Sequence, residues 1–177
     1  MIQLARMIDA MSEWLGRLVS WLTLGMVLMM TFNVVLRYAL AEGVAWQQEL
    51  VRFMHGIVFL AGASYALKHE ALVRVDVLYH NFSEHTKAWV NIVGCFIFLF
   101  PVSFALIYFS HDYVLNSWAI YEGSAEYKGM PGVFLFKSFI WVAGATLILQ
   151  GVSMVVHSIN QLSDKEHTPH ENEEVHG

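Results

Sequence analysis

Residues 88–110 read AWVNIVGCFIFLFPVSFALIYFS, an unbroken run of 23 positions without a charged side chain. A helix rises about 1.5 Å per residue, so this run is long enough to cross hydrocarbon about 30 Å thick. Lipid offers no partners for backbone N–H and C=O groups, so a single spanning segment has to be helical. The stretch therefore predicts a membrane-spanning helix, and it decides the fold class.

The rest of the chain contains three more charge-free runs. They cover residues 18–36, 53–67 and 138–156. The second reaches spanning length only if its helix begins near Ala45 and carries Glu49 and Arg52 in its first turns. We predict an all-α integral membrane protein with four transmembrane helices, of which helices 1 and 2 begin with short amphipathic segments. The predicted spans are about 14–37, 46–68, 87–111 and 135–157.

The four spans form one predicted domain, residues 1–162. The tail at 163–177 is rich in Glu and His, so we expect it to be disordered and cytoplasmic. The first apolar run is too long for a secretory signal peptide and no small-residue cleavage site follows it, so we expect it to be retained.

The composition excludes several classes of protein. Of the 177 residues, 56% are hydrophobic and 14% are charged, against about 45–50% and about 25% in an ordinary soluble domain. The net charge of −5 argues against nucleic acid as a partner, because phosphate binding needs clustered cations. The single cysteine, Cys95, excludes an internal disulfide and a Cys-based metal site. We expect membrane lipids as partners, and no cofactor or metal.

The basic residues set the expected orientation. Six lie on the side of the two termini: Arg6, Arg17, Lys68, Arg74, Lys87 and Lys165. Four lie on the other side: Arg37, Arg52, Lys128 and Lys137. Cytoplasmic loops carry an excess of Lys and Arg, so we predict that both termini are cytoplasmic.

Polar residues gather at the expected outer ends of helices 1 and 2. Asn33 and Arg37 are four positions apart, and Trp46, Glu49 and Arg52 recur every third position, so each set shares a helix face. Such groups are costly within a span and mark a pathway, a pairing or a partner surface. We interpret the five as one cluster, in which Glu49 neutralises Arg37 or Arg52 and Asn33 satisfies a remaining donor. The alternative is snorkelling of the two arginines, with Trp46 in the aromatic belt.

Nine histidines leave a different function open. His55 and His111 are expected near the outer surface, and His69 and His157 near the inner surface. Two histidine pairs at two depths of a four-helix bundle are how a di-haem cytochrome b-type anchor of a redox enzyme holds its cofactors. This anchor is the alternative function. No Ser/His/Asp or Cys/His constellation shares a polar cleft, so we predict no enzymatic activity.

An ordered series of short motifs carries a resemblance to a known family. The motifs are NVVLRY (33–38), WQQELVR (46–52), VRVDV (73–77), EGSAE (122–126) and GMP (129–131). In this order and spacing they resemble the small membrane subunit of tripartite ATP-independent periplasmic (TRAP) transporters. Arg74 and Asp76, in the third motif, form a candidate cytoplasmic loop motif.

The resemblance implies a sodium-driven importer of organic anions in the bacterial inner membrane. A periplasmic binding protein would deliver the substrate to a large membrane subunit, and the small subunit would be a non-catalytic scaffold that helps to dock the binding protein. The five-residue cluster would then face or brace the large subunit. Glu122, Glu126 and Lys128 would contact the binding protein, unless they are ordinary solvated loop charges. A third interpretation, a self-contained transporter or channel, is disfavoured because no polar face lines the spans.

Overall fold

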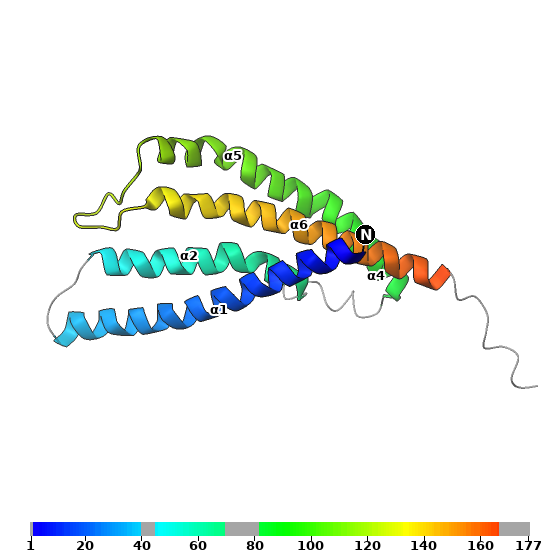
Figure 1. Ribbon diagram of the computed structural model, residues 1–177, viewed down its shortest axis with the longest axis horizontal. Coiled ribbons are helices and arrows are strands. Elements are labelled where there is room, and N and C mark those ends of the chain that lie inside the picture. Colours follow the sequence, from blue (N-terminus) through cyan, green and yellow to red (C-terminus); the bar gives the residue numbers. More distant parts are fainter. Residues whose placement is uncertain (1, 40–44, 70–81, 167–177) are drawn as a thin grey trace, which may run out of the picture.

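The computed structural model of the chain describes residues 2–39, 45–69 and 82–166. These residues form long helices and, within those ranges, no strand (Figure 1). The elements are α1 (Ile2–Ala39), α2 (Ala45–Lys68), α4 (Glu84–Gly94), the π-helical turn η1 (Cys95–Leu99), α5 (Phe100–Ala119) and α6 (Val133–Glu166). Because α4, η1 and α5 are continuous, the described residues form four helical segments long and apolar enough to span a membrane. This confirms the all-α, four-span fold class.

The first and last helices are longer than the predicted spans. The sequence predicts a first span from about residue 14, whereas α1 begins at Ile2. At the other end of the chain α6 continues past Ser163 to Glu166. The remainder of the predicted tail lies outside the described residues.

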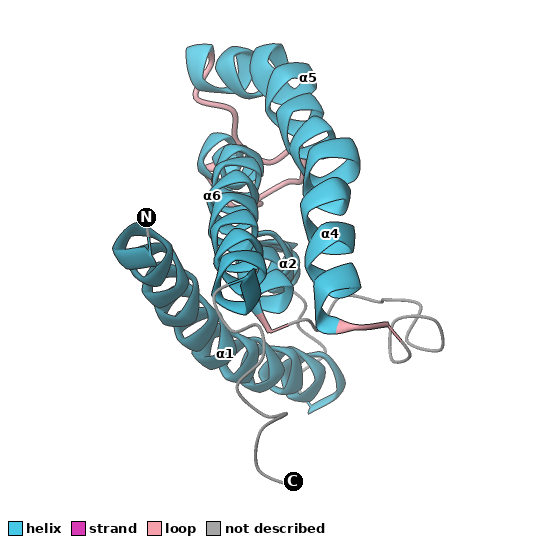
Figure 2. Cartoon of the chain, turned by 90° about the vertical axis from the view of Figure 1, so that its right-hand side faces the viewer, coloured by secondary structure: helices cyan, strands magenta, loops and turns pink. Residues whose placement is uncertain are grey.

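α6 is the central helix of the bundle. It packs against α1, α2, α4 and α5, while α1 and α2 pair with each other on one side of it and α5 lies on the other (Figures 1 and 2). We call the end with the start of α1 and the end of α6 the amino-terminal end. The opposite end, which holds residues 120–132, is the loop end.

The helices meet through small side chains. The buried residues of α1 recur every third or fourth position: Ala5, Ile8, Ser12 and Gly16. Gly16 lies against the ring of Tyr65, where a Cβ has no room. Apolar side chains gain little by exchanging lipid for another apolar surface, so close packing of small residues drives helix association in membranes. The bundle is therefore held by narrow interfaces of Ala, Gly and Ser.

The third span packs against α6 with the same helix face along its whole length. Small buried residues recur at intervals of seven, with one interval of eight: Ala88, Cys95, Ser103, Ser110 and Ser117. η1 absorbs the extra residue, because the Phe100 N–H donates to the Cys95 carbonyl, five positions back. Pro101 explains the location, since it lacks an N–H and its ring clashes with the carbonyl four positions earlier. The third span therefore contains a π-helical turn directly before Pro101.

Large apolar side chains cover the outside of the bundle. Trp21, Phe59, Phe98 and Phe109 are each more than two-thirds exposed. Apolar surface of this extent is not tolerated by monomeric proteins in water. In a bilayer it is the surface that contacts lipid or another membrane subunit.

Candidate functional site

At the loop end, Glu49 holds the loop 120–132 against α2. Its buried carboxylate accepts a hydrogen bond from the Ser124 hydroxyl and a second, 2.6 Å long, from the Met130 backbone N–H. The Arg52 guanidinium, one turn further along α2, lies 3.7 Å from the same carboxylate. We call Glu49, Ser124 and Met130 the loop anchor.

The backbone of the loop is folded closely around this anchor. The Ser124 N–H donates to the Met130 carbonyl at 3.1 Å. Lys128 takes the left-handed conformation, with φ 54°, which is unfavourable for a residue with a side chain. A Cβ at Gly129 would lie 2.7 Å from Oε2 of Glu49. Glycine is therefore required there for the loop to approach the carboxylate.

A second contact fastens the loop to α6. The Lys137 ammonium, nearly buried, lies 2.5 Å from a Glu122 carboxylate oxygen and 3.8 Å from the centre of the Tyr113 ring. The ammonium of Lys137 holds the pKa of the Glu122 carboxyl below its usual value of 4.5. Glu122 thus joins the start of the loop to α6.

The structure brings together part of the predicted five-residue cluster. Glu49 lies beside Arg52, one of its two expected partners, but its hydrogen bonds come from the loop. Among the described residues Arg37 has no ion pair, and the Asn33 Nδ2 atom is hidden without an acceptor. Both residues line, with Arg52, a groove of about 620 Å³ between α1 and α2. Trp46, at the start of α2, is 39% exposed.

The other predicted site residues differ in their surroundings. Glu126 and Lys128 are exposed at the loop end, and Glu126 also lines the groove. Glu122 is engaged by Lys137, which sets it apart from them. Arg74 and Asp76 lie outside the described residues.

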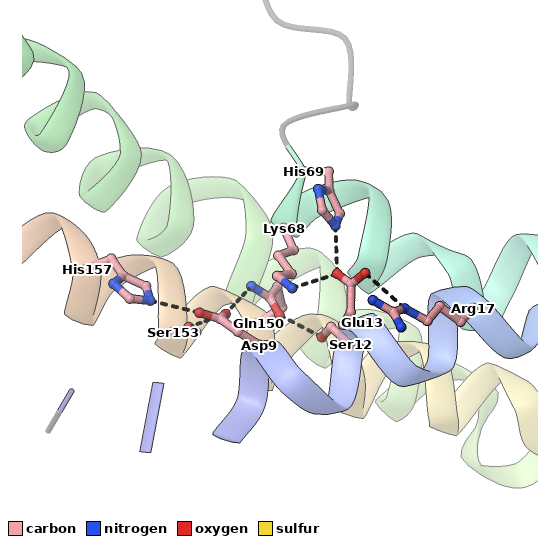
Figure 3. A network of polar contacts seen from close by, with 9 residues as sticks. All are labelled: Asp9, Ser12, Glu13, Arg17, Lys68, His69, Gln150, Ser153 and His157. Atoms are coloured by element: carbon pink, nitrogen blue, oxygen red, sulfur yellow. Dashed lines mark hydrogen bonds and ion pairs between the residues drawn. The ribbon is translucent and has the colours of Figure 1, made fainter. Parts of the chain in front are cut away.

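At the amino-terminal end, Asp9 of α1 collects hydrogen bonds from α6 (Figure 3). Its carboxylate accepts from the Ser153 hydroxyl at 2.7 Å and from the Gln150 amide at 3.0 Å, and it lies 2.8 Å from His157 Nε2. The Ser12 hydroxyl donates to the same Gln150 side chain at 2.6 Å. These bonds satisfy polar side chains buried between two helices, which would otherwise be costly there.

Glu13, one turn after Asp9, contacts basic side chains at the end of α2 (Figure 3). Its carboxylate lies 2.8 Å from Lys68 Nζ, 2.9 Å from His69 Nε2 and 3.4 Å from Arg17 Nε. We call the contacts of Asp9 and Glu13 together the amino-terminal network. It joins α1 to α6 and to α2 at a single helical turn.

Comparison with known proteins places the chain in a family. The family described as "Tripartite ATP-independent periplasmic transporters, DctQ component" matches residues 26–161. The chain belongs to this family. It is a small permease subunit of a TRAP transporter and a multi-pass protein of the inner membrane.

One relative of this TRAP small permease subunit is the ectoine TRAP transporter small permease protein TeaB of Halomonas elongata. It is 28% identical over 148 residues, which cover 82% of this chain and 74% of the relative. No solved structure matches the chain significantly.

The histidines of the TRAP small permease subunit have partners that the di-haem interpretation did not foresee. Nε2 of His69 and Nε2 of His157 each lie beside a carboxylate, and the ring of His111 stacks on Trp141 with centroids 5.7 Å apart. His55 lines the α1/α2 groove at a separate place. Within the described ranges no group of three or more His, Cys, Asp or Glu could hold a metal ion.

The amino-terminal network was not predicted from the sequence. Asp9 and Glu13 are four positions apart, so they share a face of α1, and Ser12 lies beside them. Two carboxylates on one face at the start of a span, with no cation between them, were a usable signal. Apart from Arg17, however, their partners lie between 55 and 148 residues away in the sequence.

Proposed function

We propose that this chain is the non-catalytic scaffold of a sodium-coupled importer of organic anions, in which the large membrane subunit carries the substrate. The observation that supports this proposal is the absence of Asp, Glu, Lys and Arg from the central parts of the spans, residues 18–36, 53–67, 88–111 and 138–163. A transported ion or organic anion needs polar groups near the middle of the membrane. A helix bundle that only supports a partner does not.

The relative from Halomonas elongata is named for ectoine. A scaffold leaves the choice of substrate to the other two components. We therefore propose uptake of an organic solute, with an organic anion as the first candidate and ectoine as the second.

In the proposed orientation both termini are cytoplasmic and the loop 120–132 faces the periplasm. The loop would then present Glu126 and Lys128 to the binding protein, because both are exposed. Charges at the edge of an interface mainly steer encounter. Because the carboxylate of Glu122 is engaged by Lys137, we propose that Glu122 supports the loop and that Glu126 and Lys128 make the contacts to the binding protein. The loop anchor would brace the end of the bundle near which the large subunit binds.

The scaffold proposal is tested by reconstitution in liposomes. Uptake of the substrate should require the large subunit, this chain and the binding protein together, and should stop when the sodium gradient is removed. This chain alone should give no uptake. Uptake by this chain alone would refute the scaffold role, and uptake without a sodium gradient would refute the coupling.

Two variants test the proposed contacts. Glu49→Ala should lower co-purification with the large subunit, because it releases the loop from α2. Exchange of charges in Glu126→Lys with Lys128→Glu should raise the concentration of binding protein needed for half-maximal uptake. Arg17→Gln, at the other end of the bundle, is the matched control. Unchanged co-purification or unchanged dependence on the binding protein would contradict the respective contact.

A further inference from the structure

Two adjoining hollows form one long groove between α1 and α2. The first hollow, at the loop end, is the groove of about 620 Å³ already described. The second lies nearer the middle of the spans, is called the lower part of the groove, and has a volume of about 740 Å³. They share Met30, Val34, Val51 and Arg52 in their walls. The groove therefore has a polar mouth at the loop end and continues towards the middle of the spans.

The mouth is rich in hydrogen-bond donors. Arg37 and Arg52 both line it, and the Nδ2 atom of Asn33 lacks an acceptor among the described residues. Among the described residues that line the mouth, Glu126 supplies a carboxylate. Arg52 also lies 3.7 Å from the carboxylate of Glu49, which accepts two hydrogen bonds from the loop. Arg37 has no ion pair within the described residues, so its guanidinium can bind a phosphate or carboxylate group, for which Arg has the matching donor geometry.

The lower part of the groove is apolar. Its wall consists mainly of Val and Met side chains from α1, with Thr31 and His55 as the polar exceptions besides Arg52. This part extends along α1 from Val35 to Met26, which is nine residues or about 14 Å of helix. Half of a hydrocarbon core about 30 Å thick is about 15 Å. The apolar part thus has the length of an acyl chain in one leaflet.

We propose that this groove is a binding site for a phospholipid of the leaflet at the loop end. The phosphate lies between Arg37 and Arg52 with Asn33 as a further donor, and one acyl chain lies along Met30, Val34 and the apolar wall below. The match of a cationic mouth to a phosphodiester, and of the apolar length to one leaflet, identifies this occupant. The site does not depend on the proposed scaffold function, because it is complete in this chain alone.

Native mass spectrometry of the full chain, purified in mild detergent and supplied with phosphatidylglycerol, tests the proposal. The wild type should retain one lipid at low lipid concentration. The double variant Arg37→Gln with Arg52→Gln should bind about tenfold more weakly or worse, because it removes two charge-assisted contacts to phosphate. Val34→Trp, which fills the groove at an exposed position, should also lose the lipid. Arg17→Gln is the matched control and should retain it.

Circular dichroism of each variant would establish that the helices are intact. Equal lipid retention by the wild type, the double variant and Val34→Trp would overturn the proposal. Loss of the lipid from the wild type when the large subunit binds would also overturn it, since the groove would then be a surface for that subunit. Retention of the lipid in the complex would support it even if transport failed.

Discussion

The two ends of the bundle use carboxylates in opposite ways. At the loop end a single buried carboxylate, Glu49, is bound mainly by neutral donors of a loop, and the arginines around it face a groove. At the amino-terminal end two carboxylates of α1, Asp9 and Glu13, collect donors from α6 and α2. One end fixes a loop and leaves cationic groups at the surface, while the other joins helices to each other. Interfaces of small apolar residues set the distance between helices, whereas these polar contacts fix which turns meet.

The largest effect is expected from Asp9→Ala. This change leaves the buried amide of Gln150 without its acceptor and leaves the Ser153 hydroxyl with only the longer bond, 3.3 Å, to the Ala5 carbonyl. A buried group that loses its partner costs about 1–3 kcal/mol. We expect a clear fall in the midpoint of thermal unfolding in detergent, followed by circular dichroism. Asp112→Asn, an exposed acid on α5, is the control and should change the midpoint little. Equal stability of both variants would show that the network does not join α1 to α6.

Glu49→Ala should act on the loop and leave the helices intact. Loss of the carboxylate frees Ser124 and the Met130 N–H, so the loop 120–132 should open more often. We expect limited proteolysis in this loop to become about tenfold faster, because an exposed loop is cleaved in proportion to its open population. Helix content should stay constant. Cleavage at the wild-type rate would mean that Glu49 is not the anchor.

Glu13→Gln should have a smaller effect than Asp9→Ala. Its partners Lys68, His69 and Arg17 are partly exposed and can turn to water, where ion pairs contribute little. We expect a small decrease in thermal midpoint that shrinks further at high salt, because salt screens exposed pairs. A fall as large as that of Asp9→Ala would contradict the distinction between the two carboxylates.

The smallest effect concerns pH at the loop end. The pKa of Glu122 is lowered in the folded state by Lys137, so its contribution is complete above the usual value of 4.5 and is lost as the pH falls through the lower folded value. Loop protection against proteolysis by an acid-tolerant protease should therefore decline below pH 4.5. Glu122→Gln should remove that part of the decline. A decline of the same size in this variant would assign it to another group.

The spans could be predicted because each contains a charge-free run that lipid permits only as a helix. Their limits could not be predicted equally well. Read locally, the charges of Asp9 and Glu13 indicate a segment outside the membrane. In the structure both carboxylates have partners on α2 and α6, and α1 begins at Ile2.

The predicted cluster at the loop end likewise shows that local sequence patterns do not predict contacts between distant segments. The spacing of Glu49 and Arg52 could predict their pairing, because residues three apart on a helix are neighbours. The hydrogen bonds that Glu49 accepts from Ser124 and Met130 join residues 75 and 81 positions apart. A local sequence pattern cannot predict contacts at that separation. Asn33 and Arg37 share a helix face as expected, yet the groove they line depends on how α2 packs beside α1.

The π-helical turn at Cys95–Leu99 gives the third span one spare residue. Deleting a residue there and replacing Pro101, which an uninterrupted α-helix does not accommodate, would place Cys95 and Ser103 at the regular interval of seven, so both halves would still meet α6. Insertions or deletions elsewhere in the span would instead rotate one half away from its partner. The length of this helix is therefore adjustable at one point along it, which lets the span change its reach across the membrane without a change of interface.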